Sequence, residues 1–368
     1  TGSGEGKKIM SAIKVLVVDD SITMRALFSS ALERSSDLVV IGAAANADEA
    51  REMIADMRPD VVTLDIEMPG MNGIDFLEEI MTTKPMPIVM LSTLTQKGAE
   101  VTLKALELGA VDCFPKPTKA TPDEFAKISG KLCKLVATAA KSKVKKYDPE
   151  AAAAAAAKAA EAQATLNTAK PYKWNGSIVA LCASTGGGPA VMELLSNWPA
   201  NCPPTIVLQQ LEEGLAAPFA ARLSDAIAPE VKIAEDGMML QPGHVYVLSA
   251  PDKHGIVDRW PGGAIRLMAR DPVNGMRPSA DLLLTTVAKA ARDKAVGVIL
   301  SGAGTDGAAG MSAVKQLGGL TLCQNRESAM VFEASAAAIA KGAVEAQLAL
   351  PELAKAILAR CEERDLAA

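Results

Sequence analysis

The sequence lacks the long apolar runs that a membrane protein needs. No uninterrupted apolar stretch approaches the roughly 18 to 20 residues of a membrane-spanning helix, and the first residues contain no apolar core of a secretion signal. We therefore expect a cytoplasmic protein with no segment inserted directly into a membrane. The polar start of the chain, TGSGEGKK, carries no structural pattern, so we expect a disordered tail or tag over residues 1–12.

An excess of positive charge is also missing. The formal net charge is -5, which gives no broad cationic field for a nucleic-acid backbone, so we predict no nucleic-acid partner and expect a protein partner. CxxC spacing is absent as well, so we expect neither a structural zinc site nor disulfides. The six cysteines lie mostly in apolar stretches and are predicted to be small buried hydrophobes: Cys113, Cys133, Cys182, Cys202, Cys323 and Cys361.

What is present is a chain of 368 residues, 49% hydrophobic, which is long enough for two domains. Over residues 13–140, β-branched runs alternate with helical patterns. Strands that alternate with helices predict βαβ units, in which a parallel sheet has helices on both faces. The strand-like runs are IKVLVV, DLVVIGAA, DVVTLD, PIVMLS and AVDCF, and the helical patterns include TMRALFSSALER, ADEAREMIADM and AEVTLKALELG.

Residues 141–175 separate this domain from the rest of the chain. The segment is first basic and then dominated by alanine, with almost no large apolar residues, so it cannot form a core. Alanine with Glu and Lys favours helix, and Pro149 must lie at or before the start of such a helix. The sequence therefore predicts a semi-rigid helical linker.

A second α/β domain is expected over residues 176–368, where the alternation resumes. Its strand-like runs are SIVALCA, PTIVLQ, VYVLSA, AVGVILSG and LTLCQ, and its helical patterns are PAVMELLSNW, ADLLLTTVAKAAR and AGMSAVKQLG. The PGG triplet at 261–263 separates two further strand-like runs, which predicts a β-hairpin excursion. The fold class is thus α/β, with two doubly wound parallel sheets.

Acidic residues follow two strands of the first domain. Asp19 and Asp20 follow IKVLVV, and Asp65 follows DVVTL. The carboxyl ends of parallel strands meet at one edge of a sheet, so these carboxylates should converge and attract a hard cation. Mg²⁺ prefers oxygen ligands and retains phosphate oxygens in its shell, which suits a carboxylate that attacks a phosphoryl group.

Two more strand ends of this domain bear polar groups. Ser92 follows PIVML and would offer a hydroxyl to a phosphoryl oxygen, while Lys116 in FPKP would offer positive charge. Each residue taken alone could equally be a loop or helix cap, because Asp and Ser commonly begin helices. All five together, each at the appropriate strand end, favour a phosphoryl-transfer site.

The motifs VLVVDDS, LDIEMPGMNG, MLST and FPKP resemble the receiver domains of two-component response regulators, over roughly residues 13–140. The resemblance implies a flavodoxin-like fold in which Asp65 accepts the phosphoryl group and Asp19, Asp20 and Asp65 hold Mg²⁺. It further implies Ser92 as the switch hydroxyl and Lys116 as the phosphate-sensing cation. Cys113 stands where such domains often have a switch aromatic.

In the second domain, Ser184 follows a strand and precedes three glycines and a helix. A serine at such a turn can act as a nucleophile beside backbone N–H groups that hold an oxyanion, or it can simply begin the helix. Asp306 follows another strand in a glycine-rich loop. It could orient a histidine, or it could cap the helix at Gly307.

Five segments of this domain resemble the catalytic domain of CheB-type protein-glutamate methylesterases: CASTGGGPA, EDGMMLQPGHVYVLSAPDKH, DPVNGMRPSADLLL, AVGVILSGAGTDGAAGM and CQNRESAMVFEA. The resemblance implies a Rossmann-like domain without its own cofactor, in which Ser184 is the nucleophile and Asp306 orients a histidine. The implied substrates are glutamate methyl esters on chemoreceptor cytoplasmic helices, with glutamine deamidation in many members. The implied phosphodonor is a sensor histidine kinase of the CheA type.

This sequence departs from the family at the base. Where the family has a histidine after the strand PTIVLQ, this chain has Gln210, and a glutamine amide cannot accept the serine proton. The family match places His244 and His254, the two histidines of the sequence, away from the triad. Two hypotheses follow: a degenerate, phosphorylation-controlled binding protein, and an active methylesterase that uses Ser184 with rearranged chemistry. Further departures near the expected cleft are Gly275, Met276 and residues 333–335.

Overall fold

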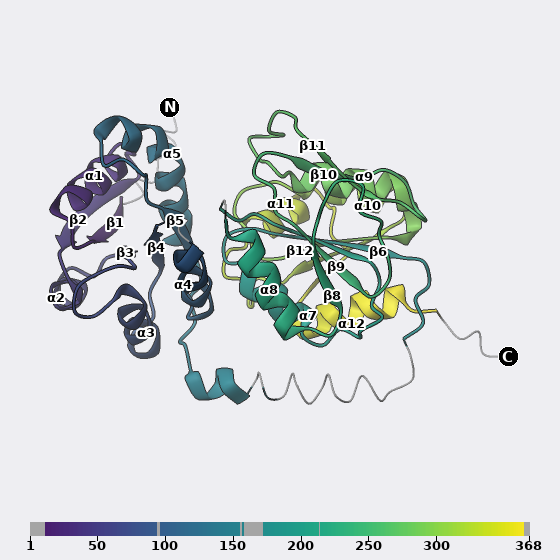
Figure 1. The fold of residues 1–368 in the computed structure, drawn as a ribbon, viewed down its shortest axis with the longest axis horizontal. Helices are drawn as coiled ribbons and strands as arrows, with labels where there is room; N and C mark the ends of the chain where they lie inside the picture. The colour runs from purple at the N-terminus through teal and green to yellow at the C-terminus, as the bar shows by residue number, and fades with distance from the viewer. Residues whose placement is uncertain (1–11, 94–95, 155–156, 158–171, 213, 364–368) are drawn as a thin grey trace, which may run out of the picture. The chain divides into compact units, whose positions relative to one another are not determined.

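The computed structural model describes residues 12–93, 96–154, 157, 172–212 and 214–363. The chain divides into two compact units, each with its own parallel sheet (Figure 1). This architecture confirms the predicted α/β class with two doubly wound sheets. No helix among the described residues is both long enough and apolar enough to cross a membrane.

The first sheet has five strands in the order β2-β1-β3-β4-β5, and every pairing is parallel. Every residue of β3 and β4 is buried, which requires that both faces of the sheet are covered. The elements in chain order are β1 (Ile13–Val18), α1 (Ile22–Leu32), β2 (Leu38–Ala44), α2 (Ala47–Met57), β3 (Val61–Asp65), α3 (Gly73–Thr83), β4 (Ile88–Ser92), α4 (Gln96–Glu107), β5 (Asp112–Pro115) and α5 (Pro122–Ala139).

Side-chain caps fix where the helices of this unit begin. Ser21, Asn46, Asn72 and Thr121 each accept a hydrogen bond from a backbone N–H in the first turn of α1, α2, α3 and α5. Helices α1 and α5 then pack on each other, with the rings of Phe28 and Phe125 edge to face at 4.9 Å. The caps and this packing together hold the strand-to-helix loops at one edge of the sheet.

The second sheet has seven parallel strands in the order β14-β13-β12-β6-β7-β9-β8, and a separate antiparallel pair, β10-β11. Its elements are β6 (Ile178–Ala183), α7 (Gly188–Leu195), β7 (Thr205–Gln209), α8 (Ala216–Ala226), β8 (Glu230–Ile233), β9 (His244–Leu248), β10 (His254–Val257), β11 (Ile265–Met268), α9 (Ala280–Ala291), the 3₁₀ turn Arg292–Lys294, β12 (Ala295–Ile299), α10 (Ala308–Gln316), β13 (Leu320–Gln324), α11 (Glu333–Ala340), β14 (Ala346–Leu348) and α12 (Leu350–Cys361).

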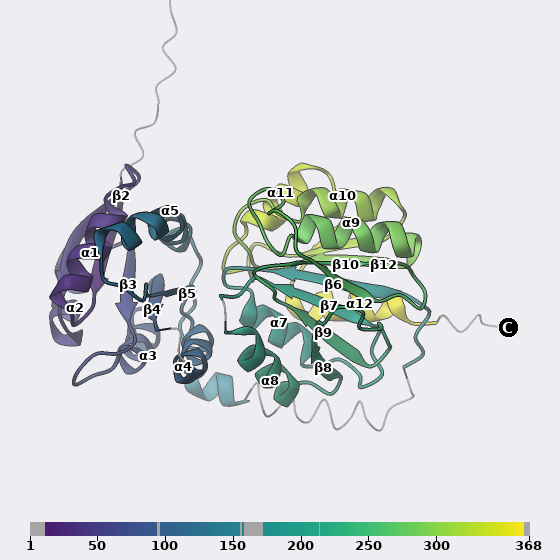
Figure 2. The same cartoon turned by 45° about the horizontal axis from the view of Figure 1, so that its top comes forward.

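Helices cover both faces of this sheet, with α9, α10 and α11 on one side and α7, α8 and α12 on the other (Figure 2). Strand β6 shows how the sequence produces two cores. Ile178, Ala180 and Cys182 pack toward α9, whereas Val179 and Leu181 pack toward α7. Successive side chains of a strand point to opposite faces, so a fully apolar strand is buried on both sides.

The predicted hairpin is confirmed as β10-β11, with the PGG triplet in its connection. All six cysteines are buried, as expected. In the linker, residues 149–154 are helical, and the helix begins at Pro149, with the Asp148 carboxylate accepting from the N–H groups of Glu150 and Ala151. The predicted helical character of residues 158–171 lies outside the described residues.

Candidate functional site

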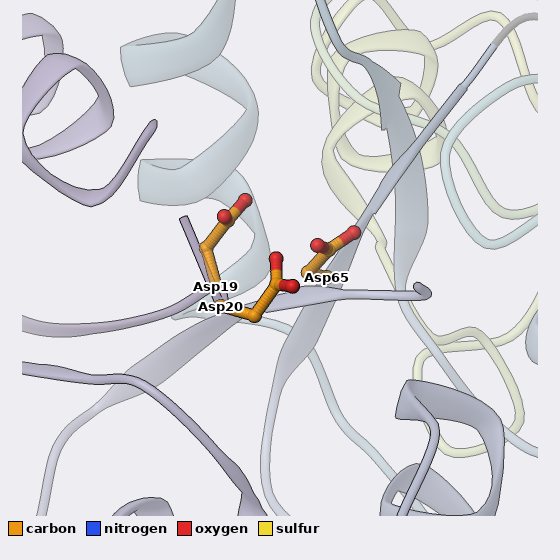
Figure 3. A group of neighbouring side chains, drawn as sticks. All are labelled: Asp19, Asp20 and Asp65. Carbon is orange, nitrogen blue, oxygen red and sulfur yellow. The ribbon is translucent and has the colours of Figure 1, made fainter. Parts of the chain in front are cut away.

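Three carboxylates meet at the carboxyl edge of the first sheet. Asp19 and Asp20 follow β1, and Asp65 ends the neighbouring strand β3, so parallel pairing brings them together (Figure 3). One oxygen of each lies within 4.8 Å of the others. Asp19 and Asp65 are buried, and Asp20 is exposed. The convergence that strand order predicts for these three side chains is therefore present.

Lys116 lies against two of these carboxylates. Its Nζ is 2.7 Å from Asp19 Oδ2 and 2.6 Å from Asp65 Oδ2, and its backbone N–H donates to the Ser92 carbonyl. Burial raises the pKa of Asp65 to about 6, although Lys116 acts in the opposite direction. Burial also lowers the pKa of Lys116, but its bonds to Asp19 and Asp65 outweigh burial, so its pKa is raised.

The charge balance of this cluster fits a divalent cation. The cluster contains three carboxylates and one lysine, so its net charge is negative and is carried by oxygen atoms. Asp20 is exposed, so the cluster is accessible to solvent. Such an oxygen set suits Mg²⁺, which also retains waters and phosphate oxygens. The carboxylates of Asp19 and Asp65 also accept hydrogen bonds from the backbone N–H groups of Ser21 and Glu67. Each therefore stabilises the turn after its strand as well as contributing to the cluster.

In the second unit, Ser184 lies on the turn between β6 and α7. Its backbone N–H donates to Ser301 O, and its Oγ accepts from the Ala303 N–H at 3.0 Å. A side chain at Gly302 would place its Cβ 2.7 Å from Ser184 Oγ, so glycine is required for this approach. Ser184 therefore does not cap α7; its hydroxyl instead faces a backbone amide beyond β12.

One small cleft brings the three predicted triad positions together. Ser184, Gln210 and Asp306 all line it. They follow β6, β7 and β12, whose carboxyl ends lie side by side where the strand order reverses, a position at which α/β sheets bind ligands. The Gln210 amide donates to Pro278 O at 3.3 Å. The side-chain amide of Gln209 donates to the carbonyls of Ser184 and Gln210, and so links the turns that follow β6 and β7.

Asp306 is held by the start of α9. It accepts from Ser279 Oγ and from the N–H groups of Ala280 and Asp281, at 2.7 to 3.0 Å. Burial raises its pKa, and these three donors act in the opposite direction. The alternative prediction was that Asp306 caps the helix that follows it at Gly307. That prediction is wrong, because the Asp306 carboxylate caps the start of α9 instead.

The following helix, α10, is capped from the other side. The Asp281 carboxylate accepts from the N–H groups of Gly307 and Gly310 at 3.0 and 2.8 Å, so α9 and α10 cap each other. Sequence reasoning missed Asp281, because an acidic residue in the first turn of a helix is too common to indicate a long-range contact.

Neither histidine lies in the cleft. His254 is fully buried, with Nδ1 facing the Ser279 N–H and Nε2 facing Asp271 O. His244 begins β9, at the amino edge of the sheet, and its Nε2 lies 2.9 Å from Glu230. The residues that line the cleft in the described part of the chain include no imidazole, and Gln210 is among them.

Comparison with known proteins gives two family matches. The receiver domain of response regulators matches residues 15–126, and the CheB methylesterase matches residues 179–357. A Caulobacter vibrioides protein named protein-glutamate methylesterase/protein-glutamine glutaminase 1 is 47% identical over 350 residues, covering 95% of this chain and 98% of that protein. An Agrobacterium fabrum protein named protein-glutamate methylesterase/protein-glutamine glutaminase is 43% identical, with 95% and 97% covered. The crystal structure of the Thermotoga maritima CheB methylesterase catalytic domain is 30% identical, covers 50% of this chain and 98% of its own, and has a TM-score of 0.49.

The paired caps give a stability prediction. We expect Asp281→Ala to lower the free energy of unfolding of the second domain by about 2–4 kcal/mol, because two buried N–H groups lose their acceptor. Asp281→Asn keeps an acceptor oxygen and should cost about 1 kcal/mol. Urea unfolding followed by tryptophan fluorescence measures this domain selectively, since Trp198 and Trp260 lie in it and Trp174, at the end of the linker, packs on Trp260. A loss for Asp281→Ala no larger than that of Ser184→Ala would contradict the role of the caps.

Proposed function

The chain belongs to the CheB methylesterase family, with a receiver domain ahead of the methylesterase domain, and from that premise we propose that it is a phosphorylation-controlled chemoreceptor-binding response regulator. In this proposal the receiver is phosphorylated on Asp65 by a CheA-type kinase. The output domain then binds the methylated glutamate or glutamine side chains of receptor helices and does not hydrolyse them efficiently. The observation that carries the proposal is that Gln210 and Ser184 line one cleft, and that no described residue lining it is a histidine.

The geometry of the receiver supports Asp65 as the acceptor. An Asp65 carboxylate that attacks a phosphorus atom gains three phosphoryl oxygens, which need positive charge around them. Lys116 already lies 2.6 Å from Asp65, and Ser92 ends the adjacent strand β4. When bound by Asp19, Asp20 and Asp65, Mg²⁺ would neutralise further charge on the phosphoryl oxygens.

The output domain keeps the parts of a serine hydrolase that do not move protons. Ser184 is held beside the Ala303 amide, and Asp306 is held by α9. Gln210 can donate and accept hydrogen bonds, but its amide has no accessible protonation equilibrium near neutral pH, so it cannot deprotonate Ser184. Loss of the histidine from a serine triad costs about a millionfold in rate in a protease. The cleft is thus better suited to holding a side chain than to cleaving it.

A second candidate function is hydrolysis itself, that is, an active protein-glutamate methylesterase with Ser184 as nucleophile. The names of the relatives at 47% and 43% identity favour this candidate. It would need another group or a water to accept the Ser184 proton, because Gln210 cannot. The two candidates differ in one measurable quantity, which is Ser184-dependent release of methanol.

We predict no Ser184-dependent methanol release from methylated chemoreceptor by the beryllofluoride-activated parent protein. Replacing Gln210 with histidine restores a proton acceptor beside Ser184, so Gln210→His should raise release at least about tenfold over the Ser184→Ala variant. Methanol is measured from receptor carrying a labelled methyl group. Release from the parent that disappears in Ser184→Ala would instead establish the second candidate.

Asp65→Asn should abolish Mg²⁺-dependent phosphorylation of the full chain by acetyl phosphate, since the amide cannot act as the nucleophile. Incorporation is measured by intact-protein mass. Asp56→Asn, on the exposed face of α2, makes the same change and should be labelled like the parent. Chelation of Mg²⁺ should also prevent labelling. Normal incorporation into Asp65→Asn would show that another residue is the acceptor.

A further inference from the structure

A run of lysines lies at the end of the receiver domain. Residues 125–147 contain seven lysines, no acidic residue and no arginine. Residues 12–124 instead carry about twice as many acidic as basic residues, and the net charge of -5 for the whole chain conceals this separation. All seven lysines are exposed: Lys127, Lys131, Lys134, Lys141, Lys143, Lys145 and Lys146.

The cationic strip consists of the last six of these lysines. Lys127 is excluded because its Nζ is 2.7 Å from the Glu124 carboxylate, which offsets its charge. Within the strip, Lys131 and Lys134 belong to α5, and the other four lysines follow the helix, where residues 143–148 form neither helix nor strand. The strip therefore begins on a helix surface and continues along an irregular segment.

The lysines of α5 lie on the face opposite the domain core. The buried residues of α5 recur at helical spacing, and Phe125 packs edge to face on Phe28 of α1. Lys131 and Lys134 lie roughly half a turn away from that buried face. A Cβ added at the exposed Gly130 would contact no atom within 4 Å among the described residues. The outer face of α5 is thus open around these lysines.

The fold itself gives no reason to gather these charges. The last turn of α5 contains no basic residue, so the lysines of this helix do not compensate its dipole there. Like charges at neighbouring positions repel each other, and a solvated protein surface usually mixes both signs. The cationic strip is therefore better explained by an anionic partner than by the stability of the domain.

The residue types of the strip indicate which anionic partner fits it. Arginine binds individual carboxylates and phosphates with a fixed pair of donors, whereas lysine acts as a hydrated point charge on a flexible stem. Residues 125–147 contain no arginine, and their two aromatic residues, Phe125 and Tyr147, are buried and half-buried, so neither offers an open ring for base stacking. Lysines alone suit a surface of many diffuse negative charges, such as a bilayer of anionic lipids.

We propose that the cationic strip docks the receiver domain on anionic phospholipid headgroups at a membrane surface, with no segment inserted. The same surface repels the acidic remainder of the receiver domain, so the domain docks with the outer face of α5 toward the lipid. This attachment does not depend on the proposed receptor-binding function. It raises the concentration of the whole chain near any partner that is itself held at the membrane.

Flotation with lipid vesicles tests the proposal on the full chain. One set of vesicles is pure phosphatidylcholine, and the other contains about one third anionic phosphatidylglycerol. At about 0.1 M salt we expect at least about tenfold tighter binding to the anionic vesicles, and about 0.5 M salt should remove that difference because the charges are screened. Equal binding to both sets, or no binding to either, would overturn the proposal.

Two quadruple variants locate the binding surface. Each lysine near an anionic surface contributes roughly fivefold in affinity, so replacing the four lysines that follow α5 should weaken binding at least about thirtyfold: K141Q, K143Q, K145Q and K146Q. The control variant makes the same change in net charge at exposed lysines elsewhere and should stay within about threefold of the parent: K84Q, K289Q, K341Q and K355Q. Equal losses in the two variants would overturn the role of the strip.

A substitution at Gly130 probes the helical part of the strip. Gly130→Glu adds a negative charge between the lysines in open space and should weaken binding about fivefold, whereas Gly130→Gln adds no charge and should bind like the parent. Equal binding by these two variants would contradict the docking of α5 toward the lipid. Tighter binding of the parent to polyglutamate or to duplex DNA than to anionic vesicles, at equal charge concentration, would assign the strip to another polyanion and overturn the lipid proposal.

Discussion

Both domains depend on one constraint, which is that every backbone hydrogen bond of a buried parallel strand must be made within the sheet while both faces are covered. Parallel neighbours require crossover helices, and these bring the strand-to-helix loops to the carboxyl edge. In the first sheet that edge collects Asp19, Asp65 and Lys116; in the second it collects Ser184 and Asp306. The sites are thus a consequence of strand order, and their chemistry is a matter of which side chains follow each strand.

Both sites also bury more carboxylate than an apolar interior tolerates, and they compensate for it differently. In the receiver domain, Lys116 pairs with Asp19 and Asp65, so the charge of a cation offsets that of the buried carboxylates. In the output domain, backbone N–H groups at helix starts offset Asp306 and Asp281. A lysine can exchange partners, whereas a helix start cannot. The first arrangement therefore suits a switch and the second suits a rigid cleft.

Much of this could be predicted from the sequence, because the signals are local. Apolar runs such as IVALCA and VVTLD identify buried strands, and the residue after each run identifies the site. Elements without such a signal were missed: β8 carries two charged residues, EVKI, and β14 has only three residues at the sheet edge. Helices α3, α5, α8, α11 and α12 were likewise not identified as separate elements, and α8 has Pro218 in its first turn. The cross-caps of α9 and α10 could not be predicted either, since they depend on how two helices pack.

Hydrogen bonds to the main chain fix the positions of Ser184 and Asp306 in the cleft. Asp306 takes its three hydrogen bonds from α9, and Ser184 is positioned by main-chain contacts with Ser301 and Ala303. Residue 210 is joined to this framework mainly through its backbone, whose N–H donates to Ala183 O and whose carbonyl accepts from Gln209, while its side-chain amide donates to Pro278 O. A substitution of the Gln210 side chain would therefore remove its bond to Pro278 O and leave the hydrogen bonds of Ser184 and Asp306 in place. A change of the side chain at position 210 can therefore alter the proton-transfer chemistry of the cleft at the cost of about one hydrogen bond, so Gln210→His tests that chemistry in an otherwise intact site.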